Sequence, residues 1–135
     1  MAGYSSTPLW KKLGYKNGME AAVEAPPPEY LKLLDLPPEL QVHWLPRSKP
    51  GVTFVHLFCR EAKGLEKRLA QLRKQIASDG IIWVSWPKKA SGTKTDITEN
   101  TVRASALPLG LVDVKVCAVD DVWSGLKLCI RKSER

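Results

Sequence analysis

The feature that most constrains the fold is a short apolar segment, residues 81–86, that stops at Pro87. A run of this length, rich in isoleucine, valine and tryptophan, is typical of a strand covered on both faces. We therefore expect Trp83 to be buried. Directly after the proline comes a basic, hydroxyl-rich segment, residues 88–95. Because ligands bind outside the carboxyl ends of strands in open α/β sheets, the sequence predicts a central strand followed by a ligand-facing loop.

Strand-like and helix-like segments alternate along the chain. In the clearest helix, residues 61–77, apolar side chains recur at helical spacing. The expected strands are residues 19–25, 40–45, 52–59, 81–86, 112–119 and 123–132, and the expected helices are residues 29–34, 61–77 and 96–107. This order favours a three-layer α/β sandwich with a mostly parallel, Rossmann-like sheet, closed by a C-terminal antiparallel hairpin. We expect a single domain spanning residues 1–135.

Several polar side chains in this pattern have both a structural and a chemical interpretation. His56 lies in an apolar strand, where a core histidine with one hydrogen bond is favoured over a catalytic base. Asp120 and Asp121 lie between the last two strands, where adjacent aspartates usually form turns rather than an acid–base pair. Asp96 is expected to cap the following helix, with Glu99 reaching back to its backbone. No catalytic residue is predicted.

The composition indicates a globular and basic protein. Hydrophobic residues make up 44% of the 135 residues, and the formal net charge is +7 at pH 7. Excess positive charge favours anionic partners such as phosphates, nucleic acid or an acidic protein. A basic surface that only keeps the protein soluble is the alternative interpretation.

The three cysteines, Cys59, Cys117 and Cys129, argue against a zinc site and a disulfide framework, because they are odd in number and have no paired spacing. The N-terminus lacks the apolar stretch of a signal peptide, and no apolar run approaches the roughly 20 residues that cross a bilayer. We therefore expect a cytoplasmic protein without a membrane segment. No cofactor and no metal are predicted.

The basic loop after the central strand is the candidate ligand site. Its lysines supply cations, its hydroxyls supply donors, its glycine lets backbone N–H groups turn inward, and the next helix points its positive end nearby. A tryptophan beside lysines can stack on a ring. The candidate ligand-binding residues are Trp86, Lys88, Lys89, Ser91, Gly92, Thr93, Lys94 and Trp123. A solvated loop with tryptophans that only pack in the core is the alternative, since the ordered phosphate-loop pattern is absent.

Long segments of the chain resemble known families. Residues 2–5, 83–92, 109–120 and 123–127 are similar to a family of small bacterial proteins carried as a domain of unknown function. A helix, Ser78-Asp79-Gly80, a strand, a helix and a hairpin, in that succession, resemble the C-terminal half of class I methyltransferases that use S-adenosylmethionine. The resemblance implies a truncated methyltransferase-like fold.

The methyltransferase pattern is incomplete at several places. Those enzymes have a glycine-rich loop after the first strand, whereas residues 24–28 read Glu-Ala-Pro-Pro-Pro. They have an acidic residue at the end of the second strand, whereas residues 43–46 contain none. Residues 58–61 stand where some of these families have an Asn-Pro-Pro-Tyr-like motif, and the chain is short by about one strand–helix unit.

These departures predict a non-catalytic module that binds a small anionic or nucleotide-like ligand at the carboxyl edge of the sheet. The alternative is a basic protein that binds nucleic acid or an acidic protein partner. An active S-adenosylmethionine-dependent methyltransferase is the least favoured function. A salt titration separates the first two, because binding along a phosphate backbone weakens steeply with salt.

Overall fold

The computed structural model describes residues 7–135, so the matching segment at residues 2–5 lies outside the described residues. The helices and strands, in chain order, are α1 (Leu9–Leu13), β1 (Glu20–Glu24), α2 (Tyr30–Leu34), β2 (His43–Leu45), β3 (Phe54–Phe58), α3 (Leu65–Gln75), β4 (Ile81–Pro87), α4 (Glu99–Ala106), β5 (Leu111–Ala118) and β6 (Trp123–Ile130). Short 3-10 turns follow three of them, at Lys89–Ser91, Leu107–Leu109 and Lys132–Glu134.

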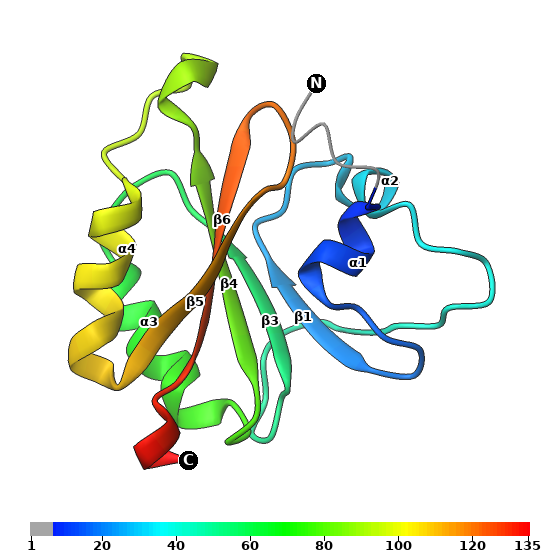
Figure 1. Ribbon diagram of the computed structural model, residues 1–135, viewed down its shortest axis with the longest axis horizontal. Helices are drawn as coiled ribbons and strands as arrows, with labels where there is room; N and C mark the ends of the chain where they lie inside the picture. Colours follow the sequence, from blue (N-terminus) through cyan, green and yellow to red (C-terminus); the bar gives the residue numbers. More distant parts are fainter. Residues whose placement is uncertain (1–6) are drawn as a thin grey trace.

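The strands form one six-stranded sheet in the order β2-β1-β3-β4-β6-β5 (Figure 1). β2, β1, β3 and β4 run parallel, whereas β6 is antiparallel to β4 and β5 is antiparallel to β6. The predicted mostly parallel sheet, its central strand and its closing hairpin are therefore confirmed. The hairpin places its turn beside the carboxyl end of β4, since Pro87 is paired with Trp123.

Helices cover both faces of this sheet, which makes the three predicted layers (Figure 1). α3 and α4 pack on one face, where Leu69 and Val102 join strand residues such as Ile82 in one apolar cluster. α1 and α2 lie on the other face, where Leu13 joins Phe54 in a second cluster. Apolar side chains thus alternate between two cores on either side of the strands, as the pleat of a sheet requires.

Trp83 is the largest fully buried side chain in the core beneath α1. It is 0% exposed, and its indole Nε1 donates a hydrogen bond of 2.8 Å to the carbonyl of Leu13 at the end of α1. The predicted burial is confirmed. The bond satisfies the indole N–H, which would otherwise lose its water partner without replacement.

Several elements are shorter than predicted, and a local turn limits two of them. The helix expected over residues 61–77 begins at Leu65, since Gly64 before it has a φ of 85° in the left-handed region. The strand expected over residues 40–45 is limited to His43–Leu45. The backbone N–H of Leu40 is used in a turn, where it donates to the carbonyl of Pro37.

The predicted cap of the last helix was wrong. Thr98, not Asp96, occupies the N-cap position: its Oγ1 accepts from the N–H of Thr101, and the Thr101 hydroxyl accepts from the N–H of Thr98. This is a capping box built from two threonines. The carboxylate of Asp96 is used elsewhere, because its Oδ1 accepts a 2.7 Å hydrogen bond from the N–H of Ala62.

The described residues carry no further covalent or metal framework. All three cysteines are free and partly buried. Among residues 7–135, no group of three histidine, cysteine, aspartate or glutamate side chains is placed to hold a metal ion. None of the helices in this part of the chain is long and apolar enough to cross a membrane.

Candidate functional site

A hollow of about 380 Å³ opens in the loop between β4 and α4, at the carboxyl edge of the sheet. A second hollow, also about 380 Å³, adjoins it where the segment after β3 meets the same loop. The first is lined by Lys89, Gly92, Thr93, Lys94, Thr95, Asp96, Ile97 and Thr98. The second is lined by Arg60, Glu61, Lys94, Thr95 and Asp96.

The first half of the loop is held by its own side chains and by the hairpin turn. The ammonium of Lys88 donates a 2.6 Å hydrogen bond to the carbonyl of Asp120. The hydroxyl of Ser91 donates to the carbonyl of Lys88 and accepts from the N–H of Thr93. Gly92 follows with a φ of 76°, a conformation that a glycine adopts without strain. Lys88 and Ser91 therefore shape the loop rather than line its hollow.

The second half of the loop is tied to the segment that follows β3. The hydroxyl of Thr95 donates a 2.6 Å hydrogen bond to the carbonyl of Arg60 and accepts from the N–H of Ile97. Asp96 accepts from Ala62 in the same segment. These bonds join the carboxyl ends of two neighbouring parallel strands, so that both hollows have a fixed wall between them.

The charges lining the main hollow are mainly positive. Lys89 and Lys94 are exposed, and neither forms an ion pair with any residue in the part of the chain that the structure describes. Asp96 is the carboxylate in this lining, and one of its oxygens is already engaged by Ala62. Arg60, in the adjoining hollow, stacks its guanidinium 4.9 Å from the ring centre of Trp123. An anion entering here would meet two unpaired ammonium groups.

The structure distributes the predicted ligand residues among three environments. Lys89, Gly92, Thr93 and Lys94 line one hollow, and their binding of a ligand stays a prediction. Lys88 and Ser91 hold the loop. Trp86 and Trp123 are only 6% and 3% exposed and belong to different apolar clusters.

The two tryptophans cannot form one stacking platform, for a geometric reason. Trp123 is paired with Pro87, the residue that follows Trp86 in β4. Because successive side chains of a strand point to opposite faces, Trp86 and Trp123 lie on opposite faces of the sheet. Both tryptophans pack in the core, which was the alternative interpretation of these residues.

Arg60, Thr95 and Thr98 line these hollows but were absent from the sequence-based candidates. The sequence could have indicated Arg60 as a candidate, because this residue directly follows the expected strand 52–59. The carboxyl ends of neighbouring parallel strands meet at one edge of a sheet, so residues after β3 and after β4 should be considered together. The threonines had no comparable signal, because their hydrogen bonds depend on where the two loops meet.

An ion pair occupies the point of the sheet where the strand order changes direction. β1 is flanked by β2 and β3, and Glu24 is the last residue of β1. Arg68 of α3 binds Glu24 in a bidentate manner, with Nε 2.8 Å from Oε1 and Nη2 bonded to Oε2. Ala25 and three prolines follow. The backbone here is therefore rigid and its carboxylate is already paired, unlike a glycine-rich loop open to a cofactor.

A buried chain of polar side chains crosses the core under α1 and α2. The hydroxyls of Tyr15 and Tyr30 are 2.6 Å apart, the Tyr30 hydroxyl is 2.8 Å from Nδ1 of His56, and Nε2 of His56 is 2.7 Å from the Ser85 hydroxyl. His56 thus has two partners rather than the one predicted. Burial lowers the pKa of His56 to about 3 and raises the pKa of both tyrosines.

This row of hydrogen-bonded side chains places a serine beside a histidine, but neither residue can be reached by a substrate. His56 and Ser85 are both fully buried. A nucleophile and its base must reach the reacting atom directly, which a closed core prevents. The favoured interpretation of His56 as a core histidine therefore holds.

Comparison with solved structures shows the same fold at low identity. A SAM-dependent methyltransferase from Aquifex aeolicus matches with a TM-score of 0.61 and 13% identity, over 89% of this chain and 86% of its own. A TehB-like SAM-dependent methyltransferase from Corynebacterium glutamicum matches with a TM-score of 0.58 and 10% identity, over 96% and 90%. LepI in complex with SAH matches with a TM-score of 0.57 and 13% identity, over 93% of this chain.

The chain spans about half of LepI, since the match covers 47% of that protein. No curated protein matches the sequence. The model of a family described as "Protein of unknown function (DUF3052)" matches residues 49–132, which include β3, α3, β4, α4 and the closing hairpin. With its methyltransferase-like sheet and its loop hollow at the carboxyl edge, this chain belongs to the DUF3052 family of proteins of unknown function.

Proposed function

We propose that this chain is a non-catalytic module of methyltransferase-like fold that binds a small anion, such as a phosphate or the phosphate of a nucleotide, in the hollow after β4. The observation that carries the proposal is that Lys89 and Lys94, which form no ion pair among residues 7–135, lie on a loop that is held in place by the hydrogen bonds of Ser91 and Thr95. A bound phosphate would gain charge-assisted hydrogen bonds from both ammonium groups.

The position of the two lysines supports a small ligand rather than a diffuse surface. Thr93 lines the same hollow as both lysines, and so does Thr98, the N-cap of α4. The first backbone N–H groups of α4 add positive potential on this side. The fixed loop also lowers the cost of binding, because its backbone is already ordered and only the two lysine side chains need to be immobilised.

The non-catalytic part of the proposal rests on what surrounds the sheet. The segment after β1 is proline-rich, and Glu24 is committed to Arg68. The serine–histidine pair that could support chemistry is buried. Calorimetry with S-adenosylmethionine should therefore give no binding, and a micromolar dissociation constant would overturn this part.

Thermal unfolding in phosphate tests the anion site. At a phosphate concentration about tenfold above its dissociation constant, binding should stabilise the fold by about 1.4 kcal/mol, or about 5 °C for a domain of this size. The double variant Lys89→Ala, Lys94→Ala should lose this increase at constant ionic strength. The matched control, Lys63→Ala with Lys67→Ala, removes the same charge from two exposed positions around the start of α3 and should keep it. If phosphate raised the melting temperatures of the two double variants equally, the loop would be a basic surface without a specific anion site.

A further inference from the structure

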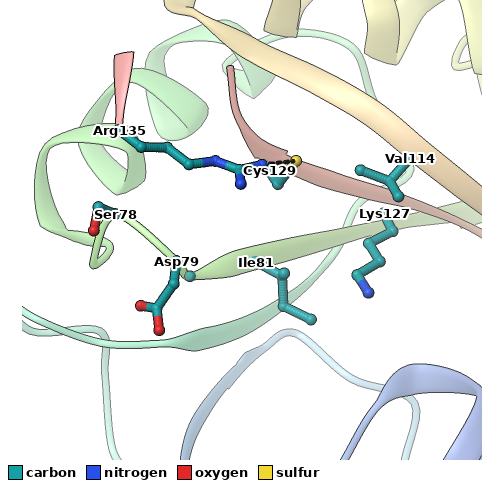
Figure 2. A pocket seen from close by; sticks show the side chains of 8 residues that line it. Ser78, Asp79, Ile81, Val114, Lys127, Cys129 and Arg135 are labelled. Atoms are coloured by element: carbon teal, nitrogen blue, oxygen red, sulfur yellow. Dashed lines mark hydrogen bonds between the residues drawn. The ribbon is translucent and has the colours of Figure 1, made fainter. Parts of the chain in front are cut away.

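The sheet face beneath α1 is not covered over its whole width. At the amino ends of β3 and β4 lie two adjoining hollows of about 250 and 370 Å³ that share Asp79, Ile81 and Lys127, and the smaller one extends to Val114 of β5. Figure 2 shows the smaller one, with Val114 of β5 beside Lys127 of β6 and Arg135 reaching over Cys129. We call the surface formed by Val114, Lys115, Lys127 and Cys129 the open face.

The open face carries positive charge at its centre. Lys115 and Lys127 are directly paired across β5 and β6, so two ammonium side chains stand on the same face of neighbouring strands. Like charges in this position destabilise a sheet unless something of opposite sign neutralises them. Lys16 and Arg135 line the same hollows, and Asp79 is the acid among these lining residues. This arrangement favours an anionic partner.

β5 is also the last strand of the sheet on this side. Its residues 113–116 are exposed, with Val114 55% and Val116 47% accessible. Val114 lies in a register irregularity on the open face, whereas Val116 pairs with Leu126 and so points to the face of α4. Exposed aliphatic side chains on both faces of an edge strand are what an added strand would cover, because such a strand contacts both faces.

We propose that β5 accepts an extended, acidic segment of a partner protein as an additional strand. Carboxylates on one face of that segment pair with Lys115 and Lys127, and aliphatic side chains on its other face cover Val116. Backbone hydrogen bonds along β5 add affinity that does not depend on the partner's side chains. This surface lies apart from the loop hollow after β4, since no residue lines both.

Two other occupants fit the observations less well. A single-stranded nucleic acid would need exposed aromatic rings for stacking, whereas the exposed large apolar side chains of β5 are valines. A second copy of the chain would bring lysines against lysines, and each copy carries a net charge of +7.

Fluorescence anisotropy on the full chain tests the proposal, with a labelled peptide that alternates glutamate and valine as the probe. The double variant Lys115→Gln, Lys127→Gln should bind about tenfold more weakly, which corresponds to a loss of about 1.4 kcal/mol. The matched control Lys63→Gln, Lys67→Gln should bind within about twofold of the wild type, as expected for charges outside the interface. A melting curve of each variant, and the single variant Lys115→Gln at an exposed position, exclude loss of folding as the cause.

Backbone pairing is tested with the same peptide methylated at alternate amide nitrogens, which keeps its charge but removes hydrogen-bond donors. Weaker binding of this peptide supports strand addition, and equal binding overturns it. Tighter binding of an oligothymidylate that depends on Lys115 and Lys127, or self-association of the chain that the same substitutions abolish, would also overturn the proposal. Unchanged phosphate stabilisation in these variants keeps the result separate from the loop hollow.

Discussion

Two polar regions begin on β4 within a few residues of each other, and they have opposite characters. Ser85 starts the buried chain that runs through His56 to Tyr30 and Tyr15, where every side chain has a partner and none is more than 4% exposed. Beyond Pro87, Lys89 and Lys94 are exposed, and neither ammonium group forms an ion pair within residues 7–135. Reactive residue types are concentrated in the first region, but only the second can meet a ligand.

The difference shows that solvent accessibility and polar groups without a partner in the protein indicate a binding site better than residue type does. Serine, histidine and tyrosine in contact suggest catalysis by type, yet in a closed core they satisfy one another and stabilise the fold. Lysine and threonine are common on any surface. They become candidates here because the surrounding loop is fixed and its own acid is engaged.

The largest effect should come from the packing that closes the first region. Trp83→Ala removes a fully buried indole and its bond to Leu13, and should lower the free energy of unfolding by about 3–5 kcal/mol. Urea denaturation measures the change. Trp44→Ala is the control, because Trp44 is 40% exposed and should cost much less. Equal losses would mean that the core under α1 is not closed.

The pH dependence of stability tests whether His56 is shielded from solvent in the folded protein. Burial lowers the pKa of His56 to about 3 in the folded protein, against 6.5 for an ordinary histidine. Because the unfolded chain takes up the proton first as pH falls, the stabilising contribution is complete above about pH 6.5 and is lost progressively toward pH 3. Between pH 7 and pH 5 the loss should be about 2 kcal/mol.

Denaturation of two variants at both pH values isolates this contribution. His56→Gln should be less stable at pH 7 but should lack the loss between pH 7 and pH 5 that His56 causes. His43→Gln replaces an exposed histidine, and this variant should keep the loss of stability between pH 7 and pH 5. If the wild-type protein had the same stability at both pH values, burial would not lower the pKa of His56 in the folded state.

The smallest effect separates two neighbouring lysines of the loop. Lys88→Met removes the bond to the Asp120 carbonyl and should cost about 1 kcal/mol, the usual contribution of a partly exposed hydrogen bond. Lys89→Met should leave stability unchanged, since the exposed Lys89 forms no ion pair among the described residues. Differential scanning calorimetry compares the two variants. A reversed order would contradict the distinction between loop-holding and hollow-lining residues.

Sequence reasoning predicted the elements that depend on near neighbours. The apolar run before Pro87, the helical spacing between Leu65 and Ile76, and the short turn between the last two strands each depend on a few neighbouring residues. Together they were sufficient to predict the mostly parallel sheet, its closing hairpin and the candidate loop. Helix ends were less accurate, because a cap such as Thr98 competes with Asp96 for a role that other contacts decide.

The sequence by itself determined the layers, the buried central strand and the excess of positive charge, because hydrophobic periodicity and composition are local properties. Only the tertiary structure decided which cations are free. Lys88 is engaged by a carbonyl 32 residues away, and Arg68 by a carboxylate 44 residues away. Partners so distant meet only after the sheet has formed, so the same residue type becomes a structural clamp at Lys88 and an unpaired charge at Lys89.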